Sequence, residues 1–125
     1  AKSIPAVPKF CFIAPPADYQ NTTGETVPQS TIDLRARMLS MGKLHPVLAI
    51  TGGICIGVAA KIPGTLVNEA VGAAADSDEI RIGHCSGILS VGADVKQTEN
   101  GVEAVSGTVF RTARVLMRGE VNIGG

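Results

Sequence analysis

The sequence predicts an α+β domain in which a curved, mostly antiparallel sheet wraps around a central apolar helix. Three observations lead to this prediction. The stretch from Pro46 to Ala60 is uncharged and holds glycines at spacings that suit close helix packing. From Glu79 onward the chain is rich in strand-forming residues, and Asn100-Gly101 has the composition of a hairpin turn. The length of 125 residues suits one domain with one core.

The opening part of the chain is predicted to form an edge strand followed by a helix. The strand covers residues 10–14 and ends at Pro15-Pro16, because proline cannot donate to a sheet. Five of the seven prolines lie within residues 1–29, and we expect this segment to continue from preceding chain. Ser30 and Asp33 have the spacing of a capping box, which predicts a half-buried surface helix ending at Gly42.

The uncharged stretch is predicted to form a buried helix that starts near Pro46 and ends near Ile62. A helix that is apolar all round must be covered by other elements. It is shorter than the roughly 20 apolar residues that cross a bilayer, so no membrane partner is expected. Small residues would give it a thin side that a sheet can approach closely: Ala49, Gly53, Gly57 and Ala60.

The second half of the chain is predicted to be mostly strands. The expected strands cover residues 80–83, 88–97, 102–111 and 114–123. Asn100-Gly101 tolerates the positive φ angles of a type I′ turn, so it should join the middle two as a hairpin.

The composition excludes several classes of function. Lysine plus arginine and aspartate plus glutamate number 11 each and are scattered, so the basic stripe that nucleic acid requires is missing. Cys11, Cys55 and Cys85 form no CxxC pair, which argues against a disulfide framework and a structural metal site. The chain shows no pattern typical of a secretory signal, so a cytoplasmic location is expected.

Two segments could bind an anion. Thr51-Gly52-Gly53 would offer free backbone amides to a carboxylate if the helix began there. If the helix begins at Pro46, those amides are used inside it and the glycines serve packing, and the sequence leaves both alternatives open. The turn from Gly83 to Gly87 could present amides, the Ser86 hydroxyl and the His84 imidazole, or could only connect two strands.

Other polar residues are weaker candidates. A thiolate at Cys55 could transfer protons near a helix start, although a cysteine between two isoleucines is more often a packed side chain. Lys43 and His45 follow the first predicted helix, where cations suit the negative end of its dipole and could also bind substrate. Three arginines could bind a carboxylate or could only be solvated: Arg111, Arg114 and Arg118.

Five separated motifs run in order along the chain: Ala14-Pro15-Pro16-Ala17-Asp18-Tyr19, Leu39-Ser40-Met41-Gly42-Lys43-Leu44-His45, Ile62-Pro63-Gly64-Thr65-Leu66-Val67-Asn68, Gly83-His84-Cys85-Ser86-Gly87 and Ala113-Arg114-Val115-Leu116-Met117. Together they resemble the carboxy-terminal third of the PrpF-type isomerases, which include methylaconitate isomerase, methylitaconate isomerase and oxalomesaconate tautomerase. The resemblance implies a diaminopimelate-epimerase-like fold of two similar lobes with substrate between them. Residues 1–125 would then form one lobe, with the first lobe absent.

The resemblance also implies the chemistry. These enzymes use no metal or organic cofactor and move a proton at the carbon next to a carboxylate of small unsaturated di- or tricarboxylic acids. The family's acid-base lysine and its Gly-Asn-Cys-Gly-type cysteine belong to the first lobe and have no match here, so Cys55 does not inherit that role. Whether this chain alone is an enzyme stays open.

Substrate binding is what the resemblance carries over. It assigns this role to His84, Ser86 and Gly87, and also to Thr51-Gly52-Gly53, although the family's usual His-Pro-Ser-Gly turn reads His84-Cys85-Ser86-Gly87 here. The expected partners are a small polycarboxylate and either the missing first lobe or a second copy of this chain. The alternative function is a stand-alone, non-catalytic binding or structural module, which could be dimeric.

Overall fold

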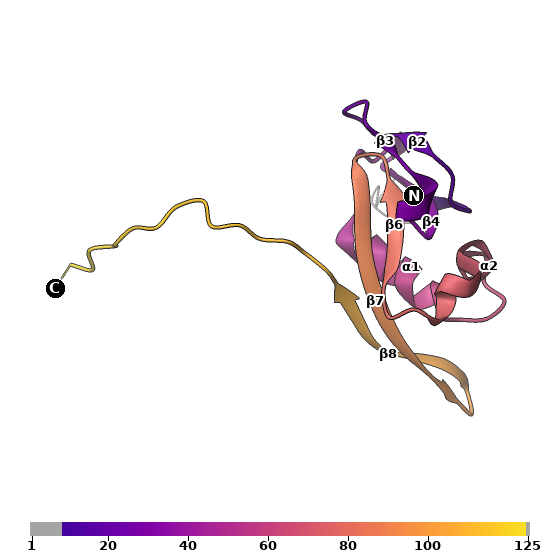
Figure 1. The fold of residues 1–125 in the computed structure, drawn as a ribbon. Helices are drawn as coiled ribbons and strands as arrows, with labels where there is room; N and C mark the ends of the chain where they lie inside the picture. Colours follow the sequence, from indigo (N-terminus) through magenta and orange to yellow (C-terminus); the bar gives the residue numbers. More distant parts are fainter. Residues whose placement is uncertain (1–8, 125) are drawn as a thin grey trace.

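The computed structural model describes residues 9–124, which form a mixed, curved sheet with α1 (Ile50–Ala60) packed on one face (Figure 1). Within these residues the strand order is β1-β4-β6-β7-β8, with β5 beside β4. The β4–β6 pair is parallel and the other pairs are antiparallel. The predicted α+β class with a mostly antiparallel sheet is confirmed. The sheet strands are β1 (Phe10–Ala14), β4 (Leu34–Ser40), β5 (Lys43–Leu44), β6 (Ile80–His84), β7 (Gly87–Thr98) and β8 (Gly101–Val109).

Smaller elements lie around this sheet. β2 (Tyr19–Gln20) and β3 (Thr26–Val27) pair as a separate ribbon. α2 (Leu66–Val71) follows α1, and the side chain of Thr65 caps it by accepting from the Asn68 amide. Short 3-10 helices cover Gln29–Thr31 and Gly72–Asp76. None of these elements was predicted, because their short sequences carry little periodicity.

Glycines let α1 approach the sheet closely. A Cβ added to Gly53 would lie 2.5 Å from Leu89 Cδ2, and one added to Gly57 would lie 2.9 Å from Val91 Cγ2. Ala60 at the end of the helix is fully buried. The predicted thin side of the helix is therefore confirmed, and it faces β7.

The start of α1 differs from the prediction. The helix begins at Ile50, so the expected start at Pro46 is wrong by one helical turn. The backbone before it makes tertiary hydrogen bonds instead, because Pro46 O accepts from the Ser86 hydroxyl and the Val47 amide contacts His45 Nδ1. Ile50 is 44% exposed, so among residues 9–124 α1 is covered on one side only.

The helix predicted for residues 30–42 is wrong, because this segment contains β4. Leu34, Ala36 and Met38 are buried, whereas Arg35 and Arg37 alternate with them, which is the two-residue period of a strand. Asp33 does not cap a helix. Its carboxylate instead accepts three hydrogen bonds from Arg81 of β6.

The type I′ turn lies at a different hairpin from the one predicted. The β7–β8 hairpin is confirmed, but among the described residues positive φ occurs at Gly101 (121°) and not at Asn100, so the type I′ prediction is wrong. Met41 and Gly42 have φ angles of 52° and 75° and join β4 to β5 as a two-residue turn. The positive angles at both positions are typical of type I′.

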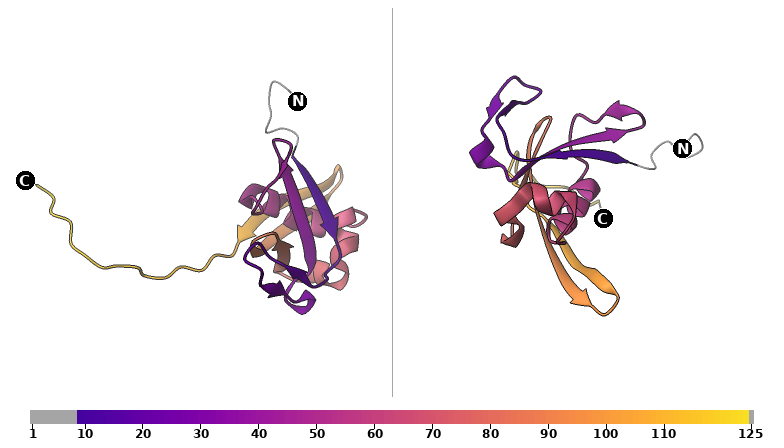
Figure 2. Two further views of the ribbon diagram at one scale, coloured as in Figure 1. Left: turned by 90° about the horizontal axis from the view of Figure 1, so that it is seen from above. Right: turned by 90° about the vertical axis from the view of Figure 1, so that its right-hand side faces the viewer.

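The strand predicted for residues 114–123 is also wrong. Residues 110–124 form no strand in the described structure, and after Thr112 the chain extends away from the body (Figures 1 and 2). Leu116 and Met117 are 79% and 84% exposed. A strand needs a neighbour to complete its hydrogen bonds, and within residues 9–124 no strand pairs with this segment.

Neither helix of residues 9–124 is long and apolar enough to cross a membrane. The same residues bring together no group of three or more side chains suited to bind a metal ion.

Candidate functional site

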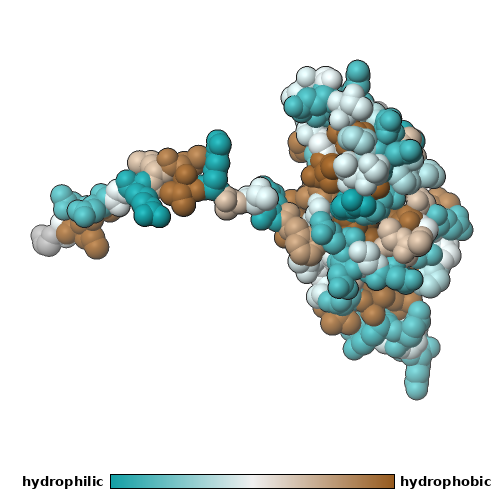
Figure 3. Space-filling view, in the orientation of Figure 1, coloured by the Kyte–Doolittle hydropathy of each residue, from teal (hydrophilic) through white to brown (hydrophobic). Residues whose placement is uncertain are grey.

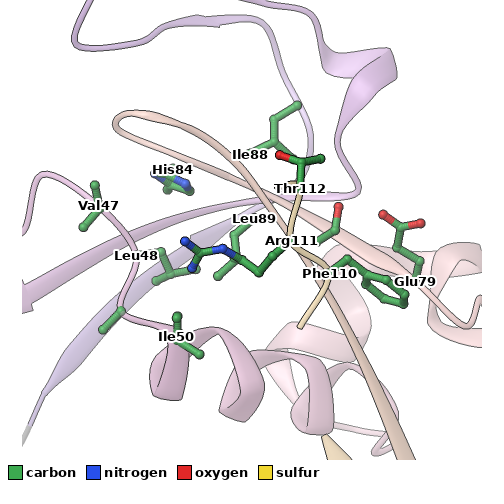
Figure 4. A pocket seen from close by; sticks show the side chains of 12 residues that line it. Val47, Leu48, Ile50, Glu79, His84, Ile88, Leu89, Phe110, Arg111 and Thr112 are labelled. Carbon is green, nitrogen blue, oxygen red and sulfur yellow. The ribbon is translucent and has the colours of Figure 1, made fainter. Parts of the chain in front are cut away.

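A cavity of about 770 Å³ opens beside the start of α1. Figure 4 shows it between the loop that leads into α1, the β6–β7 strands and the first residues after β8. The polar side chains on its wall come from segments far apart in the sequence: Glu79, His84, Ser90, Arg111 and Thr112. The rest of the wall is mainly apolar, which suits a small molecule with few polar groups to recognise.

The start of α1 supplies a positive dipole end at this cavity. Ala49 and Ile50 line the wall, and within residues 9–124 no side chain caps the helix. The first amides of a helix have no acceptor inside it, and the helix dipole makes this end attractive to an anion. The late start at Ile50 therefore leaves the amides of Thr51 and Gly52 without a helical partner.

The two alternatives for Thr51-Gly52-Gly53, free amides or packing inside the helix, apply to different residues. The Gly53 amide donates to Ala49 O at 2.9 Å, so it is used inside the helix, and Gly53 serves packing against Leu89. Thr51 and Gly52 lie in the first turn of α1, and they line a neighbouring apolar groove rather than this cavity. Their amides have no acceptor inside the helix, but neither residue lines the cavity, whereas Ile50 at the start of α1 does.

His84 lies on the cavity wall, where it is half-buried. The Ser86 amide donates to His84 Nδ1 at 3.2 Å, so the neutral ring carries its proton on Nε2. Burial lowers the pKa of His84, and the positive charge of Arg37 lowers it further. At neutral pH the ring is therefore an uncharged hydrogen-bond donor.

Ser86 and Gly87 shape the turn that carries His84. The Ser86 hydroxyl donates to Pro46 O and accepts from Thr22 Oγ1 at 3.2 Å, so its proton is already used. Gly87 has a φ of 139°, and its carbonyl accepts from the Tyr19 hydroxyl at 2.7 Å. Neither residue lines the cavity. Substrate binding by these two residues stays a prediction.

Arg111 is one of the three arginines that the sequence named as possible carboxylate ligands, and it is the one of the three that lines the cavity. Figure 4 shows its guanidinium reaching across the cavity towards Leu48, on the same side as His84, whereas Glu79 lies beyond Phe110. The Phe110 amide donates to Ser90 O at 3.1 Å and so fixes where this segment leaves the sheet. The local sequence signal is weak, because the position depends on where β8 ends.

The remaining predicted site residues lie elsewhere. Cys55 is exposed in the second turn of α1 and lines a groove of about 440 Å³ beside Met38. Lys43 is exposed in β5 and does not line the cavity. His45 shares a narrow crevice with His84, and its Nδ1 lies against the Val47 backbone. Cys55 and Lys43 are thus not brought together with His84, and their predicted roles stay predictions.

Comparison with known proteins gives a consistent result. Residues 1–124 match the family described as PrpF protein. The chain is 45% identical over 116 residues to the 2-methyl-aconitate isomerase of Shewanella oneidensis, covering 93% of this chain and 29% of that protein. It is 39% identical over 120 residues to the 3-methylitaconate isomerase of Eubacterium barkeri, covering 95% and 30%.

A solved structure agrees with these relatives. The crystal structure of methylitaconate-delta-isomerase superimposes with a TM-score of 0.73 at 33% identity, over 87% of this chain and 30% of that one. The chain thus spans about three-tenths of the length of the relatives it matches. The similarity also supports the diaminopimelate-epimerase-like fold.

Proposed function

The chain belongs to the PrpF protein family, and we propose that it forms the substrate-binding part of an isomerase acting on small unsaturated di- or tricarboxylic acids. The observation that carries this proposal is the cavity, where the start of α1, His84 and Arg111 offer three groups that attract or donate to anions. The relatives named for methylaconitate and methylitaconate support the substrate class.

The groups on the cavity wall suit proton transfer next to a carboxylate. When a base removes a proton from such a carbon, the electron pair spreads onto the carboxylate, and the double bond re-forms when a proton returns at another carbon. No electrons leave the substrate, so the reaction needs no oxidant. Hydrogen-bond donors and positive dipoles that are already in place lower the cost of the charge that develops.

We propose that the acid and the base come from another part of the parent protein. The exposed thiol of Cys55 lines a different groove from the cavity, which supports this proposal, and a first-lobe origin of the acid and the base is what the family resemblance implies. Phe10 and Phe12 of β1 are 62% and 64% exposed, and Figure 3 shows further apolar surface along the extended tail. Such exposed apolar surface supports a covering partner, either the first lobe or a second copy.

The role of Arg111 is tested by replacing it with glutamine. Tricarballylate, a saturated tricarboxylate, is expected to bind the wild-type chain and to bind Arg111→Gln about 10- to 100-fold more weakly, because a charged hydrogen bond is lost. Isothermal titration calorimetry measures both affinities. Arg114→Gln is the matched control, since Arg114 lies on the same exposed segment and does not line the cavity. Equal affinities for all three proteins would refute the proposed site.

If the acid and the base come from another part of the parent protein, this chain alone should bind substrate without converting it. Adding a separately produced first lobe is expected to restore the isomerisation of methylaconitate, followed by ultraviolet absorbance. Turnover by this chain alone would show that its own residues supply the acid and the base. Light scattering separates the two partners, because a stable oligomer of the chain alone favours the second copy and a non-catalytic module.

A further inference from the structure

We propose that Tyr19 and Arg37 are positioning residues that hold His84 as a neutral imidazole with its Nε2–H available to the cavity. The use of that donor, to bind a substrate carboxylate, rests on the proposed function. The positioning itself depends only on contacts within the chain. These contacts connect the β2–β3 ribbon and β4 to the turn that carries the His84 side chain at the end of β6.

Tyr19 bridges the two ends of the β6–β7 turn. Its hydroxyl donates to Gly87 O at 2.7 Å, at the end of the turn where β7 begins. Its ring lies against Gly83 before the turn, since a Cβ added there would be 3.0 Å from Tyr19 Cε1. One side chain therefore fixes the backbone on both sides of His84.

Arg37 lies over the Tyr19 ring and binds the same stretch of backbone. Its guanidinium carbon is 4.6 Å from the ring centroid, a cation–π arrangement. Its Nη1 donates to Gly83 O at 3.1 Å and to Ala36 O at 2.8 Å. The positive charge is thereby held beside the residue that precedes His84.

The turn itself selects one form of the imidazole. The Ser86 amide donates to His84 Nδ1, which must offer a lone pair, so the single proton of the neutral ring sits on Nε2. Protonating Nδ1 would break this bond and place a second positive charge near Arg37 in a half-buried site. Both effects oppose the imidazolium, in agreement with a His84 pKa lowered by burial and by Arg37.

The other ionisable groups around His84 come from every neighbouring segment. Tyr19 and Arg37 approach from the ribbon and β4, and Cys85 is its neighbour in the turn. Three more line the shared crevice or cavity: His45, Glu79 and Arg111. Of these groups, Arg37 is the one whose charge shifts the His84 pKa.

The selected form matters for binding an anion. With the proton on Nε2, the ring donates to a carboxylate oxygen and needs no proton from solvent. The other tautomer would turn a lone pair towards the carboxylate and repel it. We call the contacts of Tyr19 and Arg37 with the β6–β7 turn the clamp. Loss of the clamp would weaken binding of the carboxylate even though neither Tyr19 nor Arg37 lines the cavity.

Long-range ¹H–¹⁵N spectra of the imidazole rings report both tautomer and pKa without any ligand. The chain has two histidines, so a His45→Asn background leaves the signals of His84 alone. In this background His84 is expected to be the Nε2–H tautomer and to titrate below the ordinary histidine range of about 6.5. A dominant Nδ1–H tautomer would overturn the inference.

Two replacements test the clamp against a matched control. Arg37→Gln is expected to shift the His84 titration to higher pH, because a nearby positive charge is removed. Tyr19→Phe keeps the ring but loses the bond to Gly87, and it is expected to populate the Nδ1–H tautomer. Arg35→Gln removes a charge from the same face of β4, where Arg35 bonds Pro15 O, and should change neither property.

The outcomes remain separable from the proposed function. If Arg37→Gln and Tyr19→Phe leave the titration and the tautomer of His84 unchanged while the amide spectrum shows a folded chain, the positioning role is refuted. Should one variant fail to fold, the other still tests the positioning role, and a dominant Nδ1–H tautomer in the His45→Asn background would refute it in either case. Absence of a His84 response to tricarballylate would refute the carboxylate site, not the clamp seen in ligand-free spectra.

Discussion

Replacement of Ile82 by alanine is expected to lower the free energy of unfolding by about 2–5 kcal/mol. Ile82 is fully buried in the middle of β6, where it lies beside Leu34 of β4 and opposite Leu89 of β7. Truncating the side chain leaves a cavity that β4, β6 and β7 cannot fill by moving closer to one another. The free energy of unfolding of a small domain is only about 5–15 kcal/mol, so this loss is a large fraction of it.

Urea unfolding followed by circular dichroism measures this loss. Ile82→Val removes a single methylene and should cost about 0.5–1.5 kcal/mol. Ile123→Ala is the control for the loss of apolar area, because Ile123 is 93% exposed, and it should change stability by less than about 0.5 kcal/mol. Similar unfolding midpoints for Ile82→Ala and Ile123→Ala would contradict the central position of β6 in the core.

The strands around Ile82 were predictable because their signals are local. β6, β7 and β8 carry β-branched residues bounded by turn residues, and the two-residue connection of β7 to β8 fixes their register as far as the irregularity at Asp94/Val95. The tail at residues 114–123 has a similar composition yet forms no strand. Composition gives a segment its preference for extended backbone, but a strand also needs a neighbour, and sequence does not reveal whether one is present.

β4 shows how two periodicities can compete in one segment. Leu34, Ala36 and Met38 alternate with arginines, but Ile32 and Leu39 complete a pattern that also fits a helix. Ser30 and Asp33 then suggested a cap. The capping spacing is uninformative here because Asp33 finds a stronger partner in Arg81, 48 residues away in the sequence.

The candidate site divides in the same way. The turn at His84 was predictable, because glycines bracket it in the sequence. Which of the three candidate arginines would line the cavity was not predictable, because the place of Arg111 on the wall depends on where β8 ends and where the chain leaves the sheet. The predicted role of the glycines in α1 was correct for packing at Gly53 and Gly57, whereas the amides of the first turn depend on a helix start that tertiary contacts set.

Replacement of Asp33 by alanine is expected to destabilise the chain by about 1–3 kcal/mol at neutral pH. The Asp33 carboxylate accepts from the Arg81 amide at 2.7 Å, from Arg81 Nε at 3.1 Å and from Arg81 Nη2 at 2.7 Å. It thereby joins the chain just before β4 to β6, beside the parallel pair, where few backbone bonds are made. Without it, the half-buried amide and guanidinium of Arg81 lose their acceptor.

An exposed ion pair provides the comparison. Lys96 and Glu103 pair at 3.0 Å across the β7–β8 hairpin, and both side chains are 59% exposed, whereas the Asp33 side chain is 10% exposed. Glu103→Gln should therefore change stability by less than about 1 kcal/mol. A loss as large as that of Asp33→Ala would mean that charge alone, and not burial with hydrogen bonding, stabilises the β4–β6 connection.

The same interaction predicts how stability depends on acid. Burial acts to raise the pKa of Asp33, but the hydrogen bonds and the charge of Arg81 outweigh it, so the pKa is lowered in the folded chain. The stabilisation is then complete above the unfolded pKa of about 4 and is lost as the pH falls through the lower folded value. Asp33→Asn has no such proton to gain. Its unfolding free energy should fall less steeply below about pH 4 than that of the wild-type chain, and parallel pH profiles would show that Arg81 does not stabilise the ionised carboxylate.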